Sequence, residues 1–239
     1  MNEASVGDLL SLRRISQYLT QLATVIDAMT AILKNVQKGC IPRVFYDEIR
    51  PWFRGPESRP WFFEGADAAG LPQPQGLVGP SAAQSSLIHV LDIFLGVDSR
   101  TSEAHLAKGP PFLERMQSYM PRRHRAFLDH LKANPRPVRN IVECSNPVAV
   151  PEELGVRDGL KDAYNAAVMA LKRFRDEHLR IATLYIVTQA RRGSTPATPQ
   201  HQDEPATERR PKDRGTGGTE LVPFLKGVRD STAATVLKI

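Results

Sequence analysis

Cysteine is scarce in this sequence, with only Cys40 and Cys144 among 239 residues. Two cysteines cannot build the dense disulfide framework of a small secreted protein, so we expect a reducing compartment and a cytoplasmic location. The sequence also lacks a CxxC pair and any cluster of cysteine with histidine. This absence argues against a cysteine-rich zinc site.

Long hydrophobic runs and strand-like patterns are absent as well. No stretch reaches the roughly 18 consecutive apolar residues of a membrane span, and residues 1–14 lack the basic-then-apolar order of a secretory signal. No convincing alternation of apolar and polar residues predicts a strand. We therefore expect no membrane partner and a single all-α domain over residues 1–239.

Charge of one sign is only slightly in excess. The 32 Lys and Arg residues stand against 26 Asp and Glu residues, which gives a net charge of +6. The densest basic stretch, residues 122–125, is short and has no interleaved aromatic side chains. A nucleic-acid surface needs a broader basic footprint, so no nucleic-acid partner is predicted.

Helical periodicity is the dominant pattern that the sequence does contain. Apolar residues recur at steps of three and four over most of the chain, which is typical of amphipathic helices. Glycine and proline mark several of the expected helix ends. The predicted helices cover Leu9–Val36, Arg43–Phe53, Ala82–Leu95, Phe112–Met120, Pro121–Leu131, Arg157–Ala190 and Leu221–Val236.

Two segments do not follow this pattern. Residues 54–80 are rich in Gly and Pro but include Trp61, Phe62 and Phe63, so we expect an ordered loop that buries these aromatic rings. Residues 191–214 contain no aromatic residue and no aliphatic residue larger than Ala. Such a segment cannot bury enough apolar surface to offset its ordering entropy, which predicts a mobile or disordered loop.

His178 is the first candidate for chemistry. On the predicted helix it shares a face with Leu171, Phe174 and Ile181, at steps of three, four and seven. An imidazole in an apolar stripe needs a partner for its ring nitrogens. The partner is either a haem iron, which a single neutral imidazole can hold, or an ordinary hydrogen-bonding group in the core.

Asp92 and Arg175 are a second candidate group. Asp92 lies in a run of apolar residues, 87–95, that is interrupted only by His89 and Asp92 itself. A buried carboxylate needs a cation or donors, and either His89 or Arg175 could serve. Arg175 would link Asp92 to the helix of His178. Arg175 could instead meet a haem propionate or lie on a solvated helix face.

Three further groups could contact a ligand. Tyr46 and Arg50 lie one helical turn apart beside Phe45, so Arg50 could clamp a carboxylate next to an aromatic wall, or it could be a surface arginine. Residues 215–219 (GTGGT) could offer backbone N–H groups to an anion or act as a flexible hinge. Residues 81–86 are typical of an N-capped helix start with small side chains.

Six blocks of this sequence together resemble the indoleamine 2,3-dioxygenase family, and they occur in the family's order and spacing over nearly the whole chain. The blocks are RVFYDEIRPWFRG (43–55), PSAAQSS (80–86), FLERMQSYMPRRHRAFL (112–128), AYN (163–165), FRDEH (174–178) and GTGGT (215–219). The resemblance implies an all-α fold that holds haem b.

The same resemblance implies roles for individual residues. His178 matches the proximal ligand of the haem iron, and Arg175 and Asp92 match the pair that supports the proximal side. Phe45 and Arg50 match the residues that contact the indole and the carboxylate of the substrate. Tyr46 stands where many members have phenylalanine, which implies a more polar pocket wall. Ser81, Ala82 and Thr216 complete the implied substrate-binding set.

The implied function is that of a haem dioxygenase in tryptophan catabolism. It inserts O2 across the indole C2–C3 bond of L-tryptophan, or of a related indole, to give N-formylkynurenine in the kynurenine pathway. The implied partners are that indole, O2 and an electron donor that keeps the haem ferrous.

The resemblance also implies that part of the family's fold is missing here. Family members are longer at the N-terminus and carry distal-side helices without a match in this sequence. We therefore expect an N-terminally truncated haem-binding domain with impaired activity. The alternatives are a non-catalytic haem-binding remnant and an all-α interaction protein without a cofactor.

Overall fold

The computed structural model of this chain describes residues 8–53, 55, 61–74, 76–97, 111–134, 138–143, 151–192 and 215–238. Every regular element within these ranges is helical, which confirms the predicted all-α fold. None of the described helices combines the length and the hydropathy that crossing a membrane would need.

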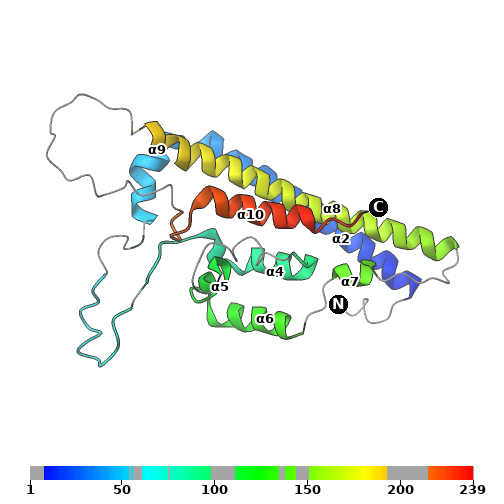
Figure 1. Cartoon of the computed structure of the whole chain (residues 1–239), viewed down its shortest axis with the longest axis horizontal. Coiled ribbons are helices and arrows are strands. Elements are labelled where there is room, and N and C mark those ends of the chain that lie inside the picture. Colours follow the sequence, from blue (N-terminus) through cyan, green and yellow to red (C-terminus); the bar gives the residue numbers. More distant parts are fainter. Residues whose placement is uncertain are drawn as a thin grey trace.

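Two long helices form the centre of the fold. Helix α2 (Leu9–Gly39) and helix α8 (Pro151–Ala182) lie side by side along most of their length. Helix α10 (Leu221–Ala234) packs along α8, and Figure 1 shows it below α8. The three helices form one layer, in which α8 contacts both of the others.

The sequence of α2 explains why it packs on α8. Leu12, Leu19 and Ile26 are each no more than 3% exposed, and they recur at helical spacing along one face. At the start of the helix, the side chain of Asp8 accepts a hydrogen bond from the backbone N–H of Ser11 at 2.7 Å. This cap satisfies one of the donors that a helix start leaves without a partner.

Helix α8 packs against its neighbours through several small side chains and one large aromatic side chain. Ala163, Ala167 and Ala170 are 7%, 0% and 0% exposed, and their small size allows close helix packing. Tyr164 is fully buried between them, and its hydroxyl donates a hydrogen bond to the carbonyl of Leu95 at 2.6 Å. Burial without this bond would leave a polar group unsatisfied, so it joins α8 firmly to the next layer.

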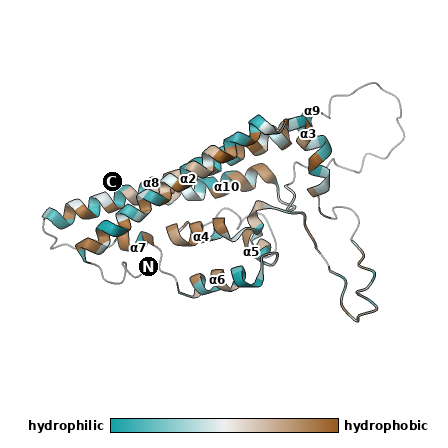
Figure 2. Ribbon diagram, turned by 180° about the vertical axis from the view of Figure 1, so that it is seen from behind, coloured by the Kyte–Doolittle hydropathy of each residue, from teal (hydrophilic) through white to brown (hydrophobic). Residues whose placement is uncertain are grey.

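Shorter helices form that second layer. Figure 1 shows α4, α5 and α6 on the far side of α10 from α8, and Figure 2 shows that α4 is hydrophobic around most of its surface. Such a helix is buried on most sides. The elements of this layer are η3 (Ala82–Gln84), α4 (Ser86–Leu95), α5 (Phe112–Gln117), α6 (Arg122–Ala133) and α7 (Val138–Glu143).

Two helical segments change their winding near one end of the molecule. Helix α8 continues through the π-helical η4 (Thr183–Val187) into α9 (Thr188–Arg192). Helix α3 (Pro42–Val44) continues through the π-helical η1 (Phe45–Ile49) into the 3-10 helix η2 (Arg50–Phe53).

The two π-helical segments are in direct contact. The rings of Phe45 and Tyr185 meet edge to face at a centroid distance of 5.7 Å. The hydroxyl of Tyr185 also donates to the carbonyl of Cys40 at 2.6 Å. Single π-helical turns are frequent at functional sites, which draws attention to this end of the fold.

Several predicted helix boundaries were wrong. The predicted helix Ala82–Leu95 is divided at Ser85, whose backbone is extended and whose hydroxyl caps α4 by accepting from the N–H of Leu87. Helix α8 begins at Pro151 rather than at Arg157, and α7 was not predicted at all. Because polar residues and glycine interrupt these short or weakly periodic segments, the apolar pattern did not reveal them.

The predicted burial of the loop aromatics was also wrong. Trp61, Phe62 and Phe63 are 52%, 66% and 44% exposed. The loop is instead tied by Gln73, whose side chain exchanges two hydrogen bonds with the backbone of Phe63 at 3.0 and 3.1 Å. Of the predicted mobile segment 191–214, Arg191 and Arg192 belong to α9 and the remainder lies outside the described residues.

We expect the contact between α2 and α8 to dominate stability. Replacing Leu19 by Ala should lower the free energy of unfolding by about 2–5 kcal/mol, because the side chain is 1% exposed and leaves a cavity. The matched control is Leu10→Ala on the same helix, where the side chain is 56% exposed and the expected loss is about 0.5 kcal/mol. Urea unfolding followed by circular dichroism measures both, and equal losses would contradict the assignment.

Candidate functional site

A cavity of about 320 Å³ lies where the π-helical segments meet the second layer. Most of its walls come from α8 with η4, the segment around η1 and η2, the turn at η3, and the glycine-rich segment with the start of α10, and Val36 of α2 and Phe112 of α5 complete the lining. Most of the lining side chains are apolar. The volume lies at the lower end of the roughly 300–1,000 Å³ found for ligand pockets.

His178 lines this cavity from α8. Ile181, Ala182 and Tyr185 follow on the same face and line it as well, as the helical spacing of the sequence predicted. Burial lowers the pKa of His178, and the nearby positive charge of Arg175 lowers this pKa further. The imidazole is therefore neutral at physiological pH, which is the form that binds a metal.

The ring of His178 makes no hydrogen bond within the described part of the chain. Among the described residues, neither ring nitrogen has the hydrogen-bonding partner that a satisfied core histidine would need, and the half-buried ring lines the cavity. The described residues also contain no group of three or more His, Cys, Asp or Glu side chains that could hold a bare metal ion. One imidazole beside apolar walls fits a metal that a macrocycle already holds, such as haem iron.

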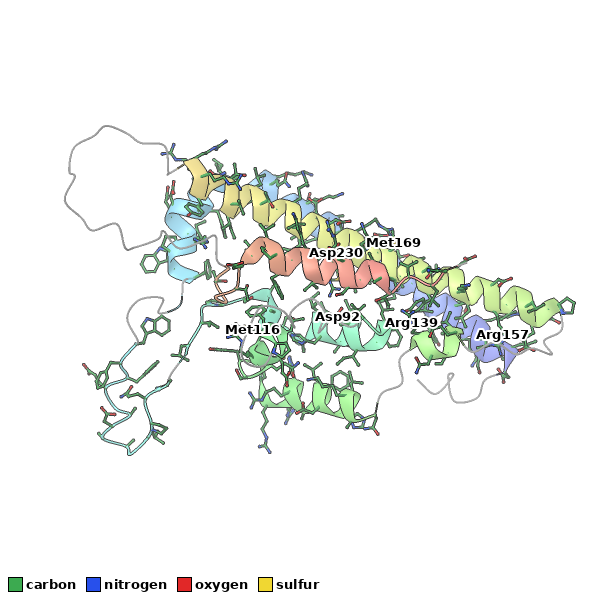
Figure 3. All side chains as sticks on the ribbon, viewed as in Figure 1. Asp92, Met116, Arg139, Arg157, Met169 and Asp230 are labelled. Carbon is green, nitrogen blue, oxygen red and sulfur yellow. The ribbon has the colours of Figure 1, made fainter. Side chains whose placement is uncertain are left out.

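Arg175 lies three residues before His178 on α8 and forms a buried ion pair. Its Nη2 donates to Oδ1 and Oδ2 of Asp92 at 2.6 and 2.9 Å, and both residues are 6% exposed. Its Nη1 donates to the hydroxyl of Thr232 and, at 3.4 Å, to the carbonyl of Val228. Figure 3 labels Asp92 on α4, beneath α10. The cluster thus joins α8, α4 and α10.

This geometry selects between the two partners predicted for Asp92. Burial raises the pKa of Asp92, and the guanidinium of Arg175, which donates to both carboxylate oxygens through Nη2, opposes that rise. His89, the other predicted partner, directs its ring nitrogens elsewhere, to Ala83 and Gln117. Arg175 is therefore the partner of Asp92, and the alternative of a solvated Arg175 was wrong.

Arg50 and Phe45 line the cavity from the side of η1 and η2. Arg50 is 5% exposed, so the alternative of a surface arginine was wrong. Tyr46 does not line the cavity; its half-buried ring lies under the guanidinium of Arg50, with 5.2 Å from ring centroid to Cζ. Tyr46 thus holds Arg50 through a cation–π contact and leaves the wall itself to Phe45.

The turn at η3 forms another wall. Ser81 and Ala82 line the cavity, as does Ala83. The hydroxyl of Ser81 accepts from the N–H of Ala83 at 3.3 Å, and the Gln84 side chain accepts from the N–H of Ser81 at 3.3 Å. This capping box fixes the turn, in agreement with the predicted N-capped start.

Thr216 ties the glycine-rich segment to that turn. Its hydroxyl donates to the carbonyl of Pro80 at 2.6 Å, and its carbonyl accepts from the N–H of Gly79 at 3.0 Å. A Cβ on the next residue, Gly217, would lie 2.7 Å from the ring of Phe112, which also lines the cavity. The absence of a side chain at Gly217 therefore allows this close approach.

Sequence reasoning missed some lining residues. Phe53, Phe112 and Phe224 all line the cavity but were taken as ordinary core positions or not singled out. Phe112 and Phe224 pack edge to face at a centroid distance of 4.8 Å. Apolar periodicity indicates that a side chain is inward-facing, but it does not distinguish a cavity wall from a filled core.

Comparison with known proteins gives a consistent result over the whole chain. A family model described as "Indoleamine 2,3-dioxygenase" matches residues 1–235. "Indoleamine 2,3-dioxygenase acdA" of Aspergillus candidus is 36% identical over 231 residues, which are 93% of this chain and 51% of that protein. "Indoleamine 2,3-dioxygenase" of Saccharomyces cerevisiae is 36% identical over 241 residues, covering 91% of this chain and 49% of that protein.

A relative with a different name matches over the same region. "Myoglobin" of Haliotis diversicolor is 32% identical over 225 residues, covering 92% of this chain and 51% of that protein. This chain spans about half the length of the curated relatives it matches.

We expect the buried ion pair to be essential for folding. Asp92→Asn should lower the free energy of unfolding by about 3–5 kcal/mol, because it leaves the buried charge of Arg175 without its counter-ion. The matched control is Asp27→Asn, which breaks a bidentate pair with Arg173 whose side chains are 46% and 49% exposed. That loss should stay below about 1 kcal/mol. Denaturant titration of the wild type and the two variants measures both losses of stability. Losses of similar size would contradict the role given to the Arg175–Asp92 pair.

Proposed function

We propose, since this chain belongs to the indoleamine 2,3-dioxygenase family, that it supplies the haem-binding side of a dioxygenase acting on L-tryptophan or a related indole. The observation that carries the proposal is the pairing of two unlike groups in one cavity. A neutral imidazole, His178, and a buried guanidinium, Arg50, both line apolar walls. The first suits iron, and the second suits a carboxylate.

The residues of the chain fit haem b on the side of His178. The imidazole would bind the iron, and the apolar Ile181 and Ala182 beside it would contact the macrocycle. The Arg175–Asp92 pair fixes α8 against α4 and keeps a positive charge near His178, which favours the neutral ring that a metal requires. These contacts fix the position of His178, the residue that would bind the iron, in the chain without a cofactor.

The remaining walls would hold and orient the indole. Phe45 offers an aromatic surface for the ring, and Arg50 offers two parallel N–H donors to a carboxylate. Tyr46 limits the movement of Arg50 through the cation–π contact. The hydroxyl of Thr216 is bonded to the carbonyl of Pro80 and that of Ser81 to the N–H of Ala83, so both residues would act by fixing the shape of the wall.

The chemistry itself belongs to the cofactor. Haem iron, when bound and kept ferrous by an electron donor, supplies the O2 chemistry by which both oxygen atoms are added across the indole C2–C3 bond to give N-formylkynurenine. The contribution of the chain is to position the indole, to exclude water with apolar walls and to keep His178 neutral.

The second candidate function is haem and O2 binding without turnover. It is favoured by one observation: the relative named "Myoglobin" is 32% identical over 92% of this chain. A third alternative, an interaction protein without a cofactor, predicts no haem binding. Experiments with reduced haem protein, O2 and L-tryptophan separate the first two, because only the dioxygenase forms N-formylkynurenine.

We expect His178→Ala to abolish the axial bond to haem. Hemin titration of the purified chain should give a Soret band for the wild type, and the variant should lose the spectrum of a histidine-ligated ferric haem. His130→Ala is the matched control, because His130 is exposed on α6 and away from the cavity lining. No Soret band in the wild type would exclude both haem functions, and an unchanged spectrum in His178→Ala would exclude this ligand.

We expect Arg50 to recognise the carboxylate of the substrate. In the haem-loaded chain, L-tryptophan should perturb the Soret band at lower concentration than tryptamine, which lacks the carboxylate. Arg50→Met should remove this preference, with a loss of at least tenfold for L-tryptophan and little change for tryptamine. Equal losses for both ligands would show that Arg50 only supports the fold.

A further inference from the structure

A chain of hydrogen bonds connects an exposed lysine with the cavity wall. Lys132 on α6 donates through Nζ to Oε1 of Gln117 at 2.8 Å. Nε2 of Gln117, at the end of α5, lies 3.3 Å from Nδ1 of His89 on α4. Nε2 of His89 lies 2.8 Å from the carbonyl oxygen of Ala83, which lines the cavity.

The two ends of this chain determine the direction of every bond in it. The ammonium group of Lys132 can only donate, so the oxygen of the Gln117 amide faces it and the NH2 group faces His89. An NH2 group also only donates, so Nδ1 of His89 carries no proton. A carbonyl oxygen only accepts, so Nε2 of His89 must carry the proton that is donated to Ala83.

Reversing the Gln117 amide would be unfavourable at both ends. Its NH2 group would then face the ammonium group of Lys132, where two donors meet, and its oxygen would face a ring nitrogen without a proton. Three different helices thus cooperate to select one tautomer of a histidine that is 5% exposed. The neutral Nε2–H form satisfies all three bonds together.

His89 holds a part of the wall that the capping box does not reach. The capping box of η3 uses the side chains of Ser81 and Gln84, and Gln84 also donates to the carbonyl of Gly79 at 3.1 Å. Neither side chain binds the carbonyl of Ala83. In the described residues, His89 provides the side-chain donor to that oxygen, and Ala83 itself lines the cavity together with Ser81 and Ala82.

We propose that His89 is a positioning residue for the η3 wall of the cavity, and that Gln117 and Lys132 fix the tautomer in which it acts. A surface charge thereby determines the placement of a wall that a bound ligand would touch. The inference rests on the proposed function only in expecting a ligand in this cavity. The hydrogen-bond directions stand without it, so the tests use the full chain without haem.

The first test is the tautomer of His89 in the wild-type chain. Long-range ¹H–¹⁵N correlation spectra of the ¹⁵N-histidine-labelled protein report which ring nitrogen carries the proton. The spectra are recorded well above the ordinary histidine pKa of about 6.5. We expect the Nε2–H form. The Nδ1–H form, or an even mixture of the two, would overturn the proposal, and this result does not depend on whether the chain binds haem.

The second test is the stability of the η3 turn. The N–H groups of Gln84 and Ser85 bond to the carbonyls of Ser81 and Ala82 at 2.9 and 3.0 Å, so their hydrogen exchange reports opening of the turn. His89→Met removes the donor to Ala83 at similar volume, and exchange at both amides should be about fivefold faster.

A matched variant distinguishes positioning from packing. In His89→Gln the side-chain NH2 can occupy the place of Nε2 and donate to Ala83, so exchange should return close to the wild-type rate. The N–H of Gly218, bonded to the carbonyl of Gly215 on another wall, should be unchanged in both variants. Equal acceleration in His89→Met and His89→Gln would overturn the positioning role.

The third test concerns the surface end of the chain. Lys132→Met frees the Gln117 amide to rotate, so the Nδ1 resonance of His89 should move. Lys226→Met is the matched control, because Lys226 is exposed on α10 and away from this chain of bonds. That variant should leave the resonance unmoved. An unmoved resonance in Lys132→Met would overturn the link between the surface charge and His89.

Discussion

The buried ion pair between Arg175 and Asp92 is the interaction on which the rest of this structure depends. It joins α8 to α4, and the same guanidinium reaches Thr232 and Val228 on α10. Each of these three helices contributes to a different side of the core. Because both charges are almost completely removed from solvent, neither can remain in place without the other. The arrangement of the helices is therefore specified by charge as well as by apolar packing.

The cavity follows from this arrangement. With α8 fixed, His178, one helical turn after Arg175, must face the space between η1, η3 and the segment before α10. Besides the large aromatic side chains in its walls, that space is shaped by contacts between the turn at η3 and the glycine-rich segment. Thr216 bonds Pro80 and Gly79, and Gly217 leaves room for the ring of Phe112. Polar groups are few in these walls, so each one has a large effect on what the cavity can bind.

Sequence reasoning was most successful where one residue breaks an apolar pattern. His178 and Asp92 each interrupt such a run, and both lie where the pattern placed them, on inward-facing sides of their helices. The apolar pattern by itself did not choose between His89 and Arg175 as the partner of Asp92, although the family resemblance paired Arg175 with it. The contact from α8 to α4 in the folded chain decides between them. The exposure of Trp61 and Phe62 was missed because the tendency of aromatic rings to be buried holds on average and not for each loop.

The apolar pattern also did not predict the π-helical segments. One of them, η4, limits how this family can vary in length. A π-turn contains one residue more than the α-turn it replaces. Deleting one residue within Thr183–Val187 would convert the wide turn into a regular α-turn, so that the helix after it would keep its direction while the residues inside the turn would point differently. Tyr185 would then lose its alignment with Cys40 and Phe45. This stretch can accept changes of side chain more readily than changes of length, so an alignment gap here would signal a differently shaped cavity.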